Sequence, residues 1–277
     1  MAHLHDFRLV FDDPMQPGAI CDGATNMARD EAMSLGVGAG AQLPTLRFYG
    51  WSPPAISLGQ SQRLAAVNVS QCCADGVDIV RRATGGLAIL HTDELTYSIA
   101  MPKNHPLAEG DVMTSYRRIA NAIMAALRGL GVANVAASAV AKEDKAKGPV
   151  CFEAPSDYEV VGEVNGVSKK LVGSAQQRRV DAVLQHGSLP LLGDIGRICQ
   201  YLVGAPPPED VHDHAATLAE AVGKPVSWRP AAELWAAAFA ENLGLRFEAG
   251  QWSEAELHQT QALRASRYAN DEWTRRR

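Results

Sequence analysis

The sequence predicts a single α+β domain in which a mixed β-sheet is flanked by helices. Short β-rich runs separated by glycine and polar breaks occupy residues 45–101 and 158–192, a pattern typical of a sheet with hairpins. Amphipathic helical patterns precede, interrupt and follow these runs. The length of 277 residues fits one large domain or two small ones. Because the proline run at residues 206–208 reads as a loop, we predict one domain over residues 1–277 whose part from about 209 to 277 is helical.

The predicted helices follow from apolar residues that recur every three or four positions. Residues 115–130 give the clearest case, and Gly131 stands where a glycine often ends a helix. The other predicted helices cover residues 23–35, 231–243 and 254–268.

The predicted strands are short runs bounded by turn residues. A hairpin is expected to turn at Asn165-Gly166, a strong two-residue turn signal. Its strands cover residues 158–164 and 167–173, and a further strand within residues 183–192 ends before Pro190. The remaining strands are expected at residues 45–58, broken at Pro53-Pro54, and at 77–81, 87–90 and 96–101.

Composition and charge exclude several classes of protein. Hydrophobic residues make up 47% and charged residues 21% of the chain, which excludes a disordered chain and a disulfide-stapled miniprotein. The formal net charge of -5 argues against nucleic acid as a partner. The most apolar window, residues 119–141, contains Arg128 and falls short of the ~20 apolar residues that cross a membrane. The absence of a signal-peptide pattern and the odd number of cysteines predict a cytoplasmic protein with free thiols and no membrane partner.

The first segment that could carry chemistry is Arg81-Arg82-Ala83-Thr84-Gly85-Gly86, followed by His91. Two arginines at a strand end supply donors suited to a carboxylate or phosphate. The glycine pair lets backbone N–H groups approach a ligand closely. A hairpin turn with a surface arginine pair has the same spacing, so this segment alone leaves both interpretations open.

Two further segments offer a nucleophile and a cation. Cys151 follows a charged loop and precedes a strand, and its thiolate would need a neighbouring cation. Lys169 and Lys170 are adjacent on a predicted strand, so one points inward when the other points outward. A desolvated lysine can hold a carbonyl oxygen or lower a thiol pKa. An inert cysteine and an exposed hairpin remain the alternatives for each segment by itself.

Small residues accompany these groups. Gly173-Ser174-Ala175 follows the lysine pair and leaves room for a ligand chain. Gln185-His186-Gly187 places polar groups and a glycine beside the same predicted sheet, although a lone histidine there is more often structural. We found no metal-binding spacing, since His212-Asp213-His214 reads as a polar loop without a third ligand.

Taken together and in this order, these segments resemble the biotin/lipoate protein ligase superfamily. Residues 81–91 look like its Arg-Arg-x-[Ser/Thr]-Gly-Gly…His signature, residues 170–176 like its Lys-x-x-Gly-x-Ala segment, and residues 185–188 like the strand after it. The resemblance extends from Arg47-Phe48-Tyr49-Gly50-Trp51 to Glu272-Trp273-Thr274 and so covers nearly the whole chain. It implies a catalytic fold like that of the class II aminoacyl-tRNA synthetases, with the three segments gathered at one site.

Within that superfamily the resemblance is to the cysteine-dependent octanoyltransferases, whose nucleophile occupies the place of Cys151. The ATP-dependent lipoate-protein ligases are the alternative, with ATP and Mg as cofactors, whereas the transferase requires none. Ligases commonly carry an Asn-Asp pair near residue 151 and a third glycine where this chain has Leu87. A non-catalytic binder of lipoyl domains or free lipoate is a third possibility, which Cys151 and Lys170 argue against.

The resemblance also implies roles for residues and partners. Cys151 would carry an octanoyl or lipoyl group as a thioester and Lys170, rather than Lys169, would face the reacting carbonyl. The acceptor would be a lysine of lipoyl-domain proteins, namely the glycine cleavage H protein and 2-oxoacid dehydrogenase E2-type domains, whose acidic surfaces would meet Lys142, Lys145, Lys147 and Lys169. The substrate-binding residues implied are Arg81, Arg82, Thr84, Gly85, Gly86, His91, Gly173, Ser174, Ala175, Gln185, His186 and Gly187.

Overall fold

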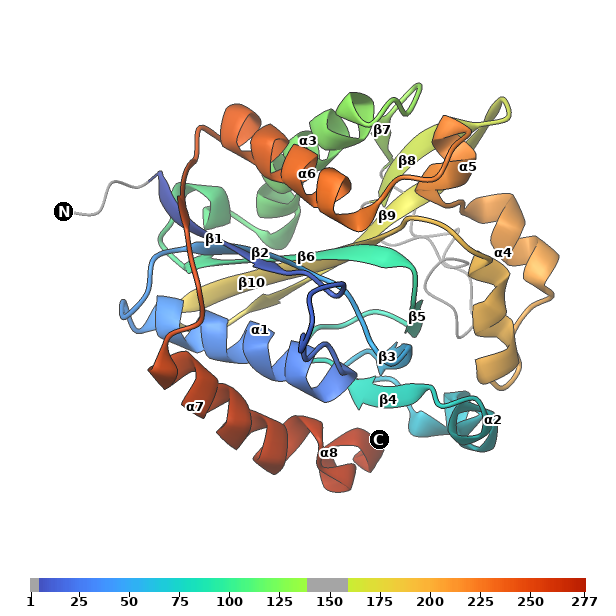
Figure 1. Ribbon diagram of the computed structural model, residues 1–277, viewed down its shortest axis with the longest axis horizontal. Coiled ribbons are helices and arrows are strands. Elements are labelled where there is room, and N and C mark those ends of the chain that lie inside the picture. The colour runs from blue at the N-terminus through green and yellow to red at the C-terminus, as the bar shows by residue number, and fades with distance from the viewer. Residues whose placement is uncertain (1–4, 139–158) are drawn as a thin grey trace.

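A computed structural model of the chain describes residues 5–138 and 159–277, in which two β-sheets are surrounded by helices (Figure 1). The large, eight-stranded mixed sheet has the order β11-β1-β2-β6-β10-β9-β8-β7. Its strands are β1 (Asp6–Asp12), β2 (Thr45–Tyr49), β6 (Glu94–Pro102), β7 (Ala136–Ser138), β8 (Glu159–Val164), β9 (Val167–Arg178), β10 (Ala182–Pro190) and β11 (Arg246–Ala249). The small sheet has the order β4-β3-β5, formed by β3 (Ala55–Leu58), β4 (Asp78–Arg81) and β5 (Ile89–His91).

Two sheets replace the one central sheet that we predicted. Residues 81–91 belong to the small sheet and not, as expected, to the sheet that carries residues 170–176 and 185–189. The chain leaves the large sheet after β2 because Pro53 and Pro54 have no N–H groups to donate to a ladder. The β3 backbone then pairs with β4 on one side and β5 on the other.

Helices cover both faces of the large sheet (Figure 1). On one face α3 packs against α6, and on the other α1 lies between the sheet and α7. The helices are α1 (Gly23–Gly38), α2 (Val69–Ala74), α3 (Val112–Gly129), α4 (Pro208–His214), α5 (Leu218–Val222), α6 (Trp228–Leu243), α7 (Glu254–Leu263) and α8 (Asp271–Arg275). Shorter turns are 3₁₀ at Leu64–Ala66, Pro106–Ala108 and Ile195–Tyr201, and a π-helical turn at Arg264–Tyr268. Within the described residues, no helix is both long and apolar enough to cross a membrane.

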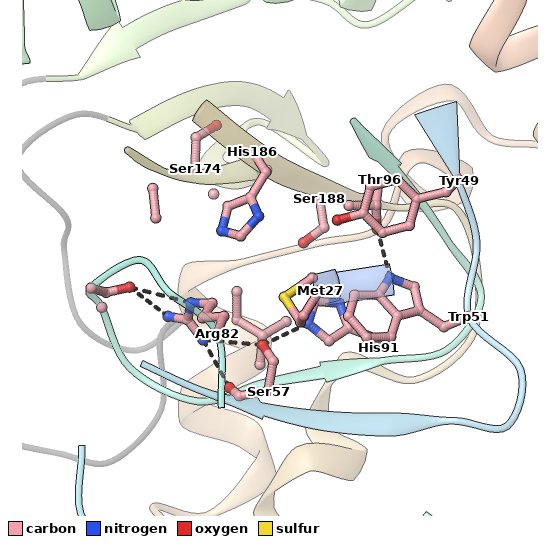
Figure 2. Close-up of a pocket in the computed structure, with 16 residues that line it drawn as sticks. Met27, Tyr49, Trp51, Ser57, Arg82, His91, Thr96, Ser174, His186 and Ser188 are labelled. Carbon is pink, nitrogen blue, oxygen red and sulfur yellow. Dashed lines mark hydrogen bonds between the residues drawn. The ribbon is translucent and has the colours of Figure 1, made fainter. Parts of the chain in front are cut away.

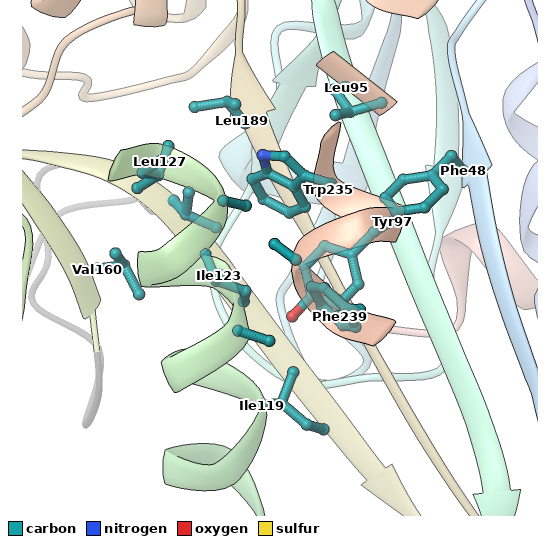
Figure 3. Close-up of a cluster of buried hydrophobic side chains, with 14 of the residues drawn as sticks. Phe48, Leu95, Tyr97, Ile119, Ile123, Leu127, Val160, Leu189, Trp235 and Phe239 are labelled. Carbon is teal, nitrogen blue, oxygen red and sulfur yellow. The ribbon is translucent and has the colours of Figure 1, made fainter. Parts of the chain in front are cut away.

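The main hydrophobic core fills the space between the sheet and the α3–α6 layer (Figure 3). Ile119, Ile123 and Leu127 of α3 are buried at the spacing that predicted this helix. They meet the aromatic rings of Trp235 and Phe239 on α6, which stack with their centroids 6.3 Å apart. Removing this apolar surface from water stabilises one face of the sheet. The other face of the sheet is covered by α1.

Most of the predicted elements are confirmed. Gly131 follows α3 at φ +96°, a conformation that glycine adopts readily. The β8–β9 hairpin turns at Asn165 and Gly166, both with positive φ. Three strands were missed, namely β1, β7 and β11, and residues 212–214 end helix α4 instead of lying in a loop.

Candidate active site

A cavity lies between the two sheets and opens to solvent. Figure 2 shows Ser174 and His186 of the large sheet on one side, with Ser57, His91 and Arg82 on the other. The lining residues are Met27, Tyr49, Trp51, Ser57, Arg82, Gly85, Gly86, Ile89, His91, Thr96, Gly173, Ser174, Ala175, His186, Gly187 and Ser188. The three predicted segments therefore meet at one site.

Arg82 shapes the glycine loop of the cavity wall. Its buried guanidinium donates to the carbonyl oxygens of Ser57, Gly85 and Leu87, each at 2.8 Å. Gly86 has φ +96°, and a Cβ on Gly59 would lie 1.9 Å from the Gly86 oxygen. The loop is thus held by a buried cation on one side and a close backbone contact on the other.

Arg81 lies elsewhere, contrary to our expectation that both arginines face the ligand. It is fully buried but does not line the cavity. Its guanidinium donates to main-chain carbonyl groups, including those of Gly59 at 2.9 Å, Gln62 at 2.5 Å and Thr274 at 2.7 Å. Successive side chains at a strand end point to opposite sides, so only one arginine of the pair reaches the cavity.

His91 lies on the cavity wall within a chain of polar contacts. Its ring stacks on Trp51 with centroids 3.9 Å apart. Its Nδ1 lies 2.7 Å from Oε1 of Glu94, and its Nε2 lies 2.7 Å from Oγ of Ser57. We did not predict Glu94, although a carboxylate three residues after the signature histidine was a usable signal.

His186 has a matching arrangement on the opposite wall. Its Nδ1 lies 3.1 Å from Oδ2 of Asp30, and its Nε2 lies 2.7 Å from Oγ1 of Thr84. Thr84 does not line the cavity and instead holds His186. Burial alone would raise the pKa of Asp30, but the His186 hydrogen bond and the charge of Arg47 bring it below its usual value. Asp30 could not be found from the sequence because it lies on α1, 156 positions before His186.

Successive side chains of β10 point to opposite faces of the large sheet. Gln185 points away from the cavity and donates to the Tyr97 hydroxyl at 2.8 Å. The prediction that Gln185 lines the substrate site is therefore wrong. Its neighbours His186 and Gly187 line the cavity. A Cβ on Gly187 would lie 2.5 Å from the Gly173 oxygen, so this strand pair tolerates only glycine there.

Lys170 lies behind the cavity wall. Its ammonium group is buried and forms an ion pair with Glu159, with Nζ 2.6 Å from Oε1. A Cβ on Gly173 would lie 3.8 Å from that Nζ, which places the ammonium beside the cavity-lining segment. Lys169 instead donates to the carbonyl oxygen of His212 at 2.5 Å. The structure thus separates the two lysines as alternation predicts. Cys151, like Lys142, Lys145 and Lys147, lies outside the described residues.

The buried lysine, the two imidazoles and the glycines of the cavity wall all lie within one stretch of the chain, residues 82–187. The sequence profile of the lipoyl protein ligase A/B catalytic domain matches residues 22–240, and the chain belongs to this family.

Relatives with assigned activities resemble this chain over most of their length. The octanoyltransferase LipM of Symbiobacterium thermophilum is 39% identical over 92% of this chain and 95% of its own. LipM of Kyrpidia tusciae is also 39% identical over the same shares of the two chains. LipM of Brevibacillus brevis is 32% identical over 99% of this chain and 100% of its own.

Solved structures show the same fold at lower identity. A bipartite lipoate protein ligase of Thermoplasma acidophilum, studied with its E2 lipoyl domain, superposes with a TM-score of 0.79 and 22% identity, covering 98% of this chain and 96% of that one. A lipoate-protein ligase A with bound ATP gives a TM-score of 0.77, also at 22% identity, covering 98% of each chain. At this identity the likeness concerns the fold.

Proposed function

We propose that this octanoyltransferase of lipoate assembly carries its acyl group on Cys151 and delivers it to a lysine of a lipoyl domain. The thiolate would attack the carbonyl of an acyl thioester, and the donor sulfur would leave with the electrons of the broken C–S bond and take a proton from water. The acceptor amine would then attack the acyl-enzyme, release Cys151 as a thiolate and give a proton to water as the amide forms.

The observation that supports this proposal best is the placement of Lys170. A buried ammonium beside Gly173 can stabilise both a thiolate and the oxyanion of a tetrahedral centre, because its charge is little screened by water. Glu159 holds the ammonium in place through their 2.6 Å contact.

The lining of the cavity is suited to an acyl chain as the transferred group. Met27, Tyr49, Trp51 and Ile89 provide apolar contact surface, and the glycines keep the opposite wall close to the backbone. Burial of an alkyl chain contributes ~0.8 kcal/mol per methylene, which amounts to several kcal/mol for an octanoyl group.

The relatives favour the transferase over an ATP-dependent ligase, which would make lipoyl-AMP from lipoate and ATP with Mg as cofactor and release pyrophosphate. The transferase chemistry proposed above needs no cofactor, because the thioester is already activated. We propose that it takes place in the cytoplasm, with the glycine cleavage H protein and E2-type domains as acceptors.

The test is an acylation assay in two stages. Incubation with an octanoyl-thioester donor alone, without ATP, is expected to add one octanoyl group to Cys151, seen by intact mass and removed by hydroxylamine. An apo lipoyl domain should then discharge the adduct and become octanoylated. Cys151→Ser should lose the thioester and nearly all turnover, whereas Cys73→Ser, at an exposed thiol outside the site, should keep both.

Two results would contradict the proposal. Full activity of Cys151→Ser together with a strict requirement for ATP would establish the ligase reaction instead. Binding of lipoyl domains without turnover under either condition would establish a non-catalytic binder.

A further inference from the structure

A second hollow lies on the surface beside the glycine loop, outside the acyl cavity. Gln60, Ser61, Arg276 and Arg277 line it. Every one of these side chains can donate hydrogen bonds, through two guanidiniums, an amide and a hydroxyl group. The hollow therefore has the chemical character of an anion site.

Tertiary contacts hold its arginines in place. The guanidinium of Arg276 stacks on Trp273 at 3.4 Å from the ring centroid and donates to the Gln60 carbonyl oxygen at 3.2 Å. The main chain of Arg277 accepts a hydrogen bond from the amide of Leu64 at 3.0 Å. An anion would thus meet donors that have already lost part of their conformational freedom.

Among the described residues, the side chains of Arg276 and Arg277 differ from those of the neighbouring arginines in having no carboxylate partner. Three nearby arginines are paired: Arg264 with Asp22, Arg267 with Glu31 and Arg275 with Asp271. Within residues 5–138 and 159–277, no Asp or Glu side chain forms an ion pair with Arg276 or Arg277.

Burial and the neighbouring positive charges lower the pKa of two arginines at this corner. Burial, and then the charges of Arg267 and Arg277, lower the pKa of Arg276. Burial, and then the charges of Arg276 and Arg277, lower the pKa of Arg81. A bound anion would relieve this repulsion, and the effect is local because the whole chain has a net charge of -5.

The hollow is connected to the acyl cavity through one turn of chain. The amide of Gln60 donates to the Thr84 oxygen at 2.8 Å, and Gly59 is in close contact with Gly86. Gly85 and Gly86 line the cavity on the other side of this turn. The turn that carries Gln60 therefore lies between the hollow and the glycines that line the cavity.

We propose that the hollow lined by Gln60, Ser61, Arg276 and Arg277 binds a phosphate group of the acyl-thioester donor. This inference rests on the function proposed above. An acyl thioester on a phosphopantetheine arm has its acyl group at one end and a phosphate ester at the other. Both an acyl carrier protein and acyl-coenzyme A present that chemistry, and guanidinium forks suit it well.

The experiment compares three donors that share the octanoyl thioester: octanoyl carrier protein, octanoyl-coenzyme A, and octanoyl-pantetheine, which has no phosphate. Formation of the acyl-enzyme is followed against donor concentration. The Arg276→Ala/Arg277→Ala variant should raise KM for the two phosphate-bearing donors about tenfold or more. Its kcat, and all constants for octanoyl-pantetheine, should stay unchanged.

Controls separate the phosphate from other causes. Arg277→Glu repeats the test at an exposed position, where loss of the Trp273 stack plays no part. Arg275→Ala, which removes the neighbouring arginine that pairs with Asp271, should leave KM unchanged. Inorganic pyrophosphate should compete with octanoyl-coenzyme A on the unaltered enzyme and lose this effect in the double variant.

The outcomes are distinguishable. A lower KM for the carrier protein or for coenzyme A on the unaltered enzyme identifies the donor whose phosphate is bound. An equal loss with octanoyl-pantetheine, or a loss with the carrier protein alone, would overturn the phosphate site. If the unaltered enzyme forms no acyl-enzyme with any donor, the failure lies in the proposed function.

Discussion

The two imidazoles on the cavity wall owe their orientation to buried carboxylates. Glu94 accepts from Nδ1 of His91, and Asp30 accepts from Nδ1 of His186. Each carboxylate selects the tautomer with the proton on Nδ1, so Nε2 accepts a hydrogen bond from a hydroxyl group. The cavity wall is thereby ordered before any substrate binds.

Asp30 should make stability depend on acid pH. Its folded-state pKa lies below the usual value of 3.8, so its contribution is fully present above about pH 4 and is lost as pH falls through the folded-state pKa. Asp30→Asn should cost about 1–3 kcal/mol at pH 7, because buried Arg47 keeps Asp12 as a partner but loses this second carboxylate. Urea unfolding from pH 7 to pH 3 should show that the difference in free energy of unfolding between the unaltered protein and Asp30→Asn becomes smaller below pH 4. A difference that does not depend on pH would contradict the lowered pKa of Asp30.

The two adjacent lysines should differ sharply in function. Lys170→Met removes the buried ammonium beside Gly173 and is expected to lower acyl transfer at least a hundredfold. Lys169→Met loses a contact with a main-chain oxygen and should retain activity within about threefold. The rates of the variants are compared at equal fractions of folded protein. The double variant Lys170→Met/Glu159→Gln serves as a control, because it also removes the charge of the Glu159 carboxylate that Lys170→Met leaves without its ammonium partner. Equal losses in the two single variants would refute the assignment.

At the scale of elements, the cavity depends on a turn after β3 that touches the glycine loop. Gly59 approaches Gly86 so closely that an added Cβ would overlap the Gly86 oxygen at 1.9 Å. Since that oxygen belongs to main chain, the loop itself would have to move. The small sheet thus positions the loop through backbone contact as well as through Arg82.

Gly59→Ala should therefore displace the loop, cost about 1–3 kcal/mol of stability and impair acyl-enzyme formation. Gly76→Ala is a matched control, because Gly76 follows α2 in open space and its φ of +66° adds backbone strain alone. Thermal unfolding and acylation rates would be measured for both. Normal acylation in a stable Gly59→Ala protein would show that the loop tolerates the shift.

At the scale of the whole molecule, segments far apart in the chain pack against each other. β1 pairs with β11, and Arg8 on β1 forms a buried ion pair with Glu256 on α7, with Nη2 2.5 Å from Oε1. Arg81 connects the end of β4 to the Thr274 carbonyl group of α8 through two hydrogen bonds. The last residues therefore brace the turn that borders both the cavity and the phosphate hollow.

Deletion of residues 271–277 and the Arg81→Met substitution should act on the same contacts. Each change is expected to destabilise the protein, and the double change should cost less than the sum by about 1–3 kcal/mol. A double-mutant cycle measured by urea unfolding tests this coupling. Additive losses would show that Arg81 and the last helix stabilise the fold separately.

The sequence by itself determined the kind of element at most positions, the family, and the segments that meet at the site. Periodicity located α3, and Asn165-Gly166 located the β8–β9 turn, because both signals depend on neighbours within a few residues. Tertiary structure alone decided the division into two sheets and the partners Asp30 and Glu159. Strand pairing and buried ion pairs join residues far apart in the chain, and their energies depend on burial that no local pattern encodes. For the same reason the sequence did not distinguish Arg81 from Arg82, whereas in the structure Arg81 binds the Thr274 carbonyl group of α8 and Arg82 lies in the cavity wall.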